Sequence, residues 1–166
     1  MDLRDTDAGA AFRKTFRAWL SDALATMPPP PLPDDWSARR VYDAAWQQRL
    51  FEAGYAGIHW PVEYGGRGAS PTEHVIFLEE SERAGAPELG VNYVAPNHAG
   101  PTIAAEGTDD QRAFHLRRII TGEEVWCQGF SEPTSGSDLA SLRTRAVDDG
   151  DSYVCPVRRS GRRTGT

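Results

Sequence analysis

The segment from Trp126 to Arg145 constrains the chain more than any other part of it. It reads Trp-Cys-Gln-Gly-Phe-Ser-Glu-Pro-Thr-Ser-Gly-Ser-Asp-Leu-Ala-Ser-Leu-Arg-Thr-Arg. We interpret it as an aromatic-rich strand, a Ser-Glu-Pro turn, a Ser-Gly-Ser-Asp loop and a returning segment. Such a loop gathers backbone N–H groups and hydroxyls in one concave place, as an anionic cofactor or a phosphate group requires. The alternative is an ordinary polar turn in which Ser131 and Ser137 bond their own backbone.

Helical periodicity dominates the chain before this segment. An apolar residue recurs at every fourth position from Phe12 to Leu24, which predicts an amphipathic helix over residues 5–26. The proline-rich residues 27–35 predict an extended connector. Ser37 is the expected cap of a second helix that stops at Gly54. The apolar positions expected along this helix are Val41, Ala45, Leu50 and Ala53.

Further helices are marked by their first residues. The sequence Ser70-Pro71-Thr72-Glu73 is a capping box that opens a helix through Ala84, with Gly85 as its end. Residues 57–68, rich in glycine and aromatic side chains, are expected to be irregular and to pack through Ile58, Trp60 and Tyr64. Residues 89–106 form an apolar helical stretch with two prolines. A second capping box at Thr108 and Gln111 predicts a helix to about Ile120.

The pattern changes from helix to strand after Gly122. Strands are expected from Val125 to Phe130, at residues 146–147 and at residues 152–154, with a turn at residues 148–151. The fold class is therefore mainly α. We predict a helical domain over residues 1–121, the start of a β domain over residues 122–155, and an aberrant, disordered tail over residues 156–166.

Composition excludes several kinds of function. The net charge of −6 and the pI of about 5.2 argue against a nucleic-acid partner. Two cysteines make neither a disulfide framework nor a metal pattern, and the four histidines lack ligand spacing, so no metal site is expected. Glu79, Glu80 and Glu82 are expected on the solvated face of their helix. No apolar run is long enough to span a membrane, so the expected location is the cytoplasm.

Taken together, these motifs resemble the N-terminal portion of acyl-CoA dehydrogenases, flavoenzymes of fatty acid metabolism that oxidise acyl-CoA thioesters. The resemblance spans most of residues 10–154. It is carried by four stretches that share the family's spacing: His59-Trp-Pro-Val-Glu-Tyr-Gly-Gly66, Gly100-Pro-Thr102 to Gly107-Thr108, Gly122-Glu-Glu124 and Trp126 to Arg145. The last is the most specific, because Ser-Glu-Pro is followed by Gly-Ser-Asp.

The resemblance implies FAD as the cofactor and acyl-CoA as the substrate. It places Gln128, Phe130 and Ser131 along the flavin, with Phe130 and Ser131 at the ring. It also places Gly136 and Ser137 at the pyrophosphate, with Ser137 touching acyl-CoA as well. The family base is a glutamate of a C-terminal helical bundle, and no residue of this sequence matches it, so no catalytic residue is assigned. A flavin-linked electron acceptor and a homo-oligomer are implied as partners.

Other interpretations stay open. The tail Pro-Val-Arg-Arg-Ser-Gly-Arg-Arg can be encoded by codons that, in another frame, give Gly-Gln-Lys-Val-Trp-Thr-Ser, a strand typical of the family. On this hypothesis the chain is incomplete and inactive alone. One alternative is therefore a non-enzymatic helical fragment from a frameshifted gene. Another is a relative of the acyl-CoA oxidases or of nitroalkane-oxidising flavoenzymes.

Overall fold

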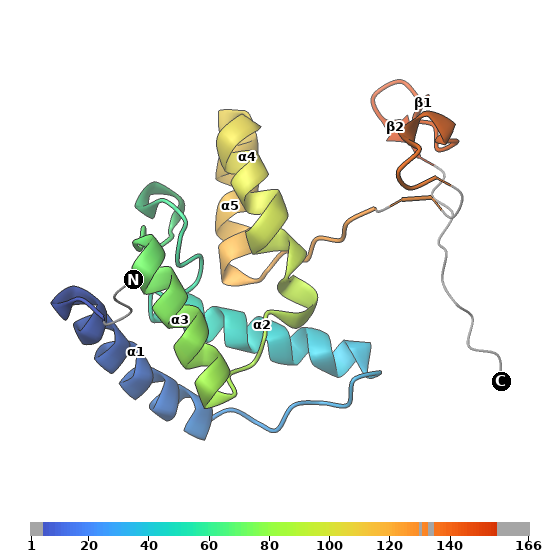
Figure 1. Cartoon of the computed structure of the whole chain (residues 1–166). Coiled ribbons are helices and arrows are strands. Elements are labelled where there is room, and N and C mark those ends of the chain that lie inside the picture. Colours follow the sequence, from blue (N-terminus) through green and yellow to red (C-terminus); the bar gives the residue numbers. More distant parts are fainter. Residues whose placement is uncertain (1–4, 130, 133–134, 156–166) are drawn as a thin grey trace. The chain divides into compact units, whose positions relative to one another are not determined.

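A computed structural model describes residues 5–129, 131–132 and 135–155 (Figure 1). The chain divides into two compact units, Met1–Cys127 and Gln128–Thr166. Among the described residues, no helix is long and apolar enough to cross a membrane. The mainly α fold class predicted from the sequence is confirmed, because helices make up most of the first unit. The predicted tail over residues 156–166 lies outside the described residues.

Helices α1 (Asp7–Ala25) and α3 (Pro71–Ala84) lie side by side in the first unit (Figure 1). The apolar spacing of α1 buries Phe12, Phe16 and Leu20 against its neighbours. The predicted capping box of α3 is present: the side chains of Ser70 and Glu73 each accept a hydrogen bond from the other residue's backbone N–H. Gly85 ends the helix with a positive φ of 64°. Both helices therefore follow their local sequence signals.

Helix α2 (Trp36–Glu52) differs from its prediction in two ways. Its cap is Asp35, whose carboxylate accepts the N–H of Ala38, so the predicted Ser37 cap is wrong. The predicted apolar face is also wrong at Val41, which is 69% exposed, and at Ala45, which is exposed. The face that packs inward instead carries Asp43, Trp46, Gln47 and Leu50. Tertiary partners decide this rotation, because polar groups from other segments meet Asp43 and Gln47.

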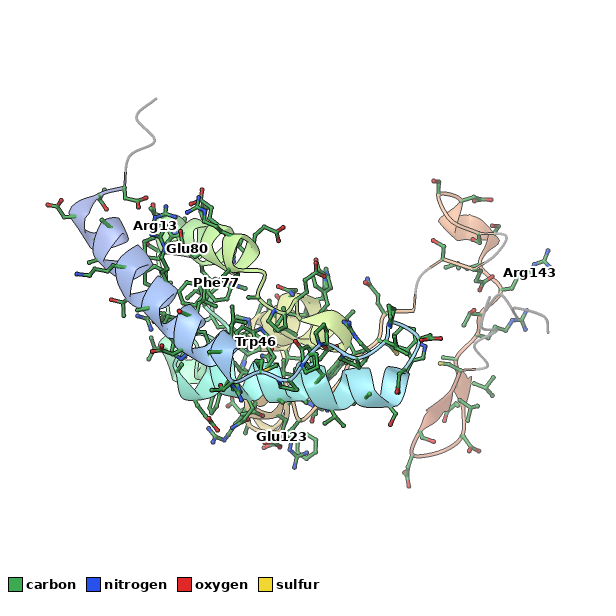
Figure 2. The ribbon with its side chains drawn as sticks, turned by 90° about the horizontal axis from the view of Figure 1, so that it is seen from below. Arg13, Trp46, Phe77, Glu80, Glu123 and Arg143 are labelled. Atoms are coloured by element: carbon green, nitrogen blue, oxygen red, sulfur yellow. The ribbon has the colours of Figure 1, made fainter. Side chains whose placement is uncertain are left out.

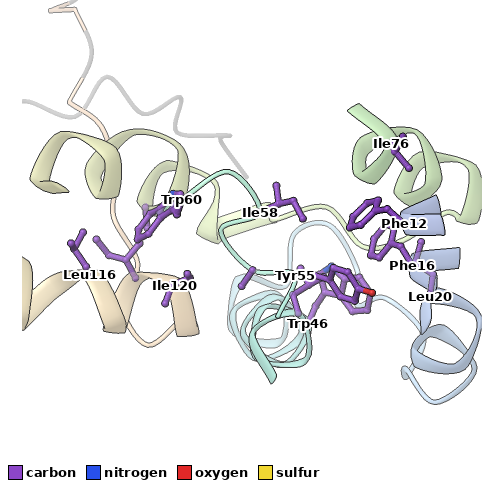
Figure 3. Packing of buried hydrophobic residues seen from close by; sticks show 14 residues of the cluster. Phe12, Phe16, Leu20, Trp46, Tyr55, Ile58, Trp60, Ile76, Leu116 and Ile120 are labelled. Atoms are coloured by element: carbon purple, nitrogen blue, oxygen red, sulfur yellow. The ribbon is translucent and has the colours of Figure 1, made fainter. Parts of the chain in front are cut away.

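Residues 53–69 link α2 to α3 and help to form the core. They include the short 3₁₀ helix η1 (Val62–Tyr64). As predicted, Ile58 and Trp60 are buried and Tyr64 is packed at the core's edge. The Trp60 indole N–H donates to the carbonyl of Pro96 at 2.9 Å. Figure 3 shows Ile58 and Trp60 among the other buried apolar side chains of this cluster.

The rest of the first unit is a series of short helices followed by a longer one. They are η2 (Gly90–Asn92), the π-helix η3 (Ala95–Ala99), α4 (Gly100–Glu106) and α5 (Asp109–Thr121). The predicted capping box at Thr108 and Gln111 opens α5, and Gly122 ends it with a φ of 81°. Leu116, Ile119 and Ile120 bury the inner face of α5.

The described part of the second unit is a loop followed by a small hairpin. It contains the 3₁₀ turn η4 (Leu139–Ser141) and the antiparallel strands β1 (Val147–Asp148) and β2 (Tyr153–Val154). The hairpin confirms the predicted strands there. The strand predicted from Val125 to Phe130 is wrong for residues 125–129, which are irregular. A strand needs a hydrogen-bonded neighbour, and residues 125–129 have none among the described residues.

Candidate functional site

The loop over residues 131–144 contains most of the residues expected to bind a cofactor. Ser131 and Gly136 lie together: a Cβ atom built on Gly136 would be 3.7 Å from the Ser131 hydroxyl oxygen. Gln128, Ser131, Gly136 and Ser137 are all exposed. Phe130, also expected at the flavin, lies outside the described residues. Two predicted site residues from opposite ends of the turn therefore meet on one accessible surface.

Glu132 closes this loop. Both oxygens of its carboxylate accept the backbone N–H of Arg143, each at 3.0 Å. One of them also accepts the backbone N–H of Thr144. Hydrogen bonds from Thr144 and from the backbone of Arg143 hold the pKa of Glu132 below its ordinary value. The bonds join residues 11 and 12 positions apart, so the segment returns on itself. No role was predicted for Glu132, because its partners are backbone groups that no side-chain pattern marks.

Ser135 is buried, with 3% of its surface exposed. Its backbone N–H donates to the carbonyl of Glu132 at 3.1 Å, and its hydroxyl donates to the carbonyl of Asp138 at 2.7 Å. The Ser141 hydroxyl donates to the same carbonyl at 3.0 Å. Sequence reasoning missed Ser135, although the serine-turn signal at this spacing could have found it. These bonds turn Ser135 inward and leave Gly136 and Ser137 outward.

The first unit holds a cavity of about 480 Å³. It lies between α2, α3 and the segment that precedes α4, and apolar side chains dominate its walls. Large side chains that line it include Trp46, Leu50, Tyr55, Phe77, Leu89 and Tyr93. Figure 2 labels two of these, Trp46 and Phe77. A cavity of this size falls in the range of small-molecule pockets, roughly 300–1,000 Å³.

Two histidines stand on the wall of this cavity. The rings of His59 and His74 are stacked, with centroids 4.9 Å apart. Burial, and then the charge of His74, lower the pKa of His59. Among the described residues, no group of three or more metal-binding side chains is placed to hold an ion. The pair therefore adds a polar edge to an otherwise apolar pocket.

The prediction that Glu80 lies on a solvated face is wrong. Its side chain is 2% exposed and accepts from Arg13 at 2.8 Å, Arg17 at 2.6 Å and Arg83 at 2.8 Å. Hydrogen bonds from Arg17 and Arg13 lower the pKa of Glu80 from 4.5 to about 2. Figure 2 shows Arg13 and Glu80 close together between α1 and α3. The prediction failed because the arginines of α1 are distant in sequence, and helical spacing alone does not reveal them.

Comparisons with known proteins agree with this architecture. Residues 6–123 match the family model described as acyl-CoA dehydrogenase, N-terminal domain. The chain belongs to the acyl-CoA dehydrogenase family.

Among curated relatives, acyl-CoA dehydrogenase IpdE1 of Mycobacterium tuberculosis is 44% identical over 155 residues, covering 86% of this chain and 38% of that protein. The mitochondrial isovaleryl-CoA dehydrogenase of Pongo abelii is 36% identical over 110 residues, covering 66% of this chain and 26% of that protein. The chain thus spans less than two fifths of the length of these relatives.

Solved structures show the same likeness. The ChsE4-ChsE5 complex from Mycobacterium tuberculosis matches with a TM-score of 0.68 and 35% identity, over 93% of this chain and 38% of that chain. A structure described as the Tcur3481-Tcur3483 steroid ACAD matches with a TM-score of 0.69 and 37% identity, over 93% of this chain and 39% of that chain.

Proposed function

We propose that this chain takes part in the FAD-dependent α,β-dehydrogenation of acyl-CoA thioesters, supplying a helical N-terminal domain and a flavin-binding loop. The observation that carries the proposal is the meeting of Ser131 with Gly136. Family membership and the Ser-Glu-Pro and Gly-Ser-Asp motifs of the loop support it. FAD, when bound, supplies the hydride acceptor, and the protein orients it.

The chemistry of the loop suits an anionic cofactor. A side chain on Gly136 would narrow the space beside the Ser131 hydroxyl, whereas glycine keeps it open. No acceptor for the backbone N–H of Gly136 or Ser137 is found within the described part of the chain, so both can donate to phosphate oxygens. The carboxylate of Glu132 already accepts hydrogen bonds from Arg143 and Thr144. Ser131, Gly136 and Ser137 would hold the cofactor, with Gln128 and Phe130 completing the surface.

A test of the loop uses ¹⁵N-labelled chain titrated with FAD to millimolar concentration. Weak binding is expected, because a loop supplies few contacts and must be ordered on binding. The amides of Gly136 and Ser137 are expected to shift. Ser131→Ala is expected to raise the dissociation constant for FAD by about two- to tenfold, the usual effect of losing one hydrogen bond. Ser152→Ala, an exposed serine of the hairpin turn, is the control.

The proposal fails if FAD leaves every amide of residues 131–144 unmoved, or if Ser131→Ala and Ser152→Ala respond alike. If FAD does shift these amides, titration with ADP and with FMN identifies the part of the cofactor that the loop recognises. A phosphate role for Gly136 and Ser137 predicts that ADP reproduces their shifts. Riboflavin, which lacks phosphate, is expected not to do so.

We further propose that the acyl group is bulky. One similar structure is described as a steroid ACAD, and the cavity of about 480 Å³ in the first unit can take a group of this size. Ser81 lies on the cavity wall, and a tryptophan there would fill the cavity. Ser81→Trp is therefore expected to abolish the binding of a bulky acyl-CoA to the chain, as measured by calorimetry. Val75→Trp, on the exposed side of the same helix, is the control. Equal loss in both variants, or none in Ser81→Trp, contradicts the assignment.

A further inference from the structure

We propose that Glu124 is a positioning residue: bound to His115, it holds Trp126 and thereby restrains the first residues of the flavin loop. The inference rests on the proposed function only for the role of that loop. The contacts themselves lie within the first unit, at the end of α5. Neither Glu124 nor Trp126 was assigned a role from the sequence.

The carboxylate of Glu124 is the centre of this cluster. One oxygen lies 2.9 Å from Nδ1 of His115 and accepts from Nε1 of Trp126 at 3.0 Å. Its other oxygen lies 3.8 Å from the Arg118 guanidinium. Since an ionised carboxylate only accepts, Nδ1 of His115 must carry the proton in this contact. The Glu124 backbone N–H donates to the carbonyl of Arg118 at 3.1 Å, so the main chain is fixed at the same place.

Helix stability does not account for a carboxylate at this place. Glu124 follows the C-terminal end of α5, where the helix dipole disfavours negative charge. Gly122 already ends the helix with a left-handed conformation. His115 and Arg118 lie close enough to offset the unfavourable negative charge of Glu124, but neither residue needs a carboxylate there for α5 to form. Besides these contacts within α5, the carboxylate provides the bond to Trp126, which lies beyond the helix.

Trp126 is the part of the cluster that leads toward the loop. Its side chain is half-buried and packs against the core, and its ring meets His115 edge-on with centroids 5.3 Å apart. Indole has a single hydrogen-bond donor, so the bond to Glu124 selects one orientation of the ring. Trp126 stands two positions before Gln128, the first residue expected at the flavin. Fixing this ring therefore restrains the main chain immediately before Gln128.

The experiment follows indole and amide signals of the ¹⁵N-labelled full chain. The five tryptophans, Trp19, Trp36, Trp46, Trp60 and Trp126, each give one indole signal. In Glu124→Gln the Trp126 indole N–H is expected to exchange with solvent about fivefold faster, since its bond to a charged carboxylate is replaced by a weaker bond to a neutral amide. Amides of residues 128–131 are expected to shift or broaden. The buried Trp46 and Trp60 are expected to stay unchanged.

Two further variants make the result specific. Glu123→Gln removes the same charge from the neighbouring residue, whose carboxylate accepts from the Thr121 hydroxyl at 3.1 Å, and is expected to leave Trp126 and residues 128–131 as they are. Trp126→Phe removes the indole donor but keeps the contact of His115 with Glu124, and is expected to reproduce the amide changes of Glu124→Gln.

The outcomes separate this inference from the proposed function. An unchanged Trp126 signal in Glu124→Gln overturns the inference. So does a changed Trp126 signal with unmoved amides at residues 128–131, because the contact would then stabilise α5 without restraining the loop. If FAD shifts no amide of the loop in the wild-type chain, the proposed function is contradicted instead. That result does not affect the inference that Glu124 restrains the loop.

Discussion

Glu80 offers a quantitative test of how α1 and α3 are held together. Replacement by glutamine keeps the shape of the side chain and removes its charge. A pKa lowered from 4.5 to about 2 corresponds to a stabilisation of about 3 kcal/mol. Arg17 and Arg83 are 58% and 64% exposed, and solvent therefore screens part of this interaction. We expect Glu80→Gln to lower the free energy of unfolding by about 2 kcal/mol at neutral pH.

The pH dependence has a definite sign. The pKa of Glu80 is lower in the folded chain than in the unfolded chain, so its ionised form stabilises the fold. This contribution is complete above about pH 5 and is lost as the pH falls from 4.5 toward about 2. Urea unfolding followed by circular dichroism measures it, with unfolding treated as two-state. The difference between wild type and Glu80→Gln is expected to fall by about half by pH 3.

Glu79→Gln is the matched control for this measurement. Glu79 precedes Glu80, is 48% exposed and makes one bond to Arg13 at 2.8 Å. Its replacement is expected to change the free energy of unfolding by less than about 0.5 kcal/mol. Equal losses at Glu79 and Glu80, or a Glu80→Gln loss that stays constant between neutral pH and pH 3, would refute the reasoning.

Three more predictions follow from the fold and from the site. Trp60→Phe removes the buried bond to the Pro96 carbonyl and is expected to cost about 1–3 kcal/mol in urea unfolding. Gly122→Ala is expected to destabilise more than Gly85→Ala: both glycines have positive φ, but an added Cβ at Gly122 would lie 2.8 Å from Gln47, whereas nothing lies within 4 Å at Gly85. Equal urea midpoints for the two would contradict this. Mixed anaerobically with FAD and acyl-CoAs, the chain is expected not to bleach the flavin, because no residue matches the family base; bleaching at the rate of an intact relative would contradict the expectation.

Local signals explain which parts of the fold could be predicted. The capping boxes at Ser70 and Thr108 act within one turn of helix, so the beginnings of α3 and α5 follow from the sequence alone. The strand expected at residues 125–129 did not form, because strand structure depends on a pairing partner. Periodicity also placed Val41 inward, although it is exposed. The rotation of a weakly amphipathic helix is decided by distant contacts.

The same distinction applies to the candidate site. Turn-forming residues made it possible to predict a loop, and the structure brings Ser131 and Gly136 of that loop together. The roles of all five residues at a flavin, Gln128, Phe130, Ser131, Gly136 and Ser137, stay predictions. The bonds of Glu132 to backbone groups, and the bond of Glu124 to His115, could not be read from the sequence, because each joins residues whose proximity arises only on folding.

The polar inner face of α2 bears on how the chain selects one packing among many. Asp43 accepts the N–H of Val91 at 2.9 Å, and the Gln47 amide donates to the carbonyl of Ile120 at 2.8 Å. Rotating α2 to bury Val41 would gain apolar contact but leave those partners without bonds. Compact misfolded states that are similarly hydrophobic are thereby raised in energy. Asp43 and Gln47 therefore favour one orientation of α2 over the alternatives. A variant with leucine at both positions is expected to populate several orientations of α2.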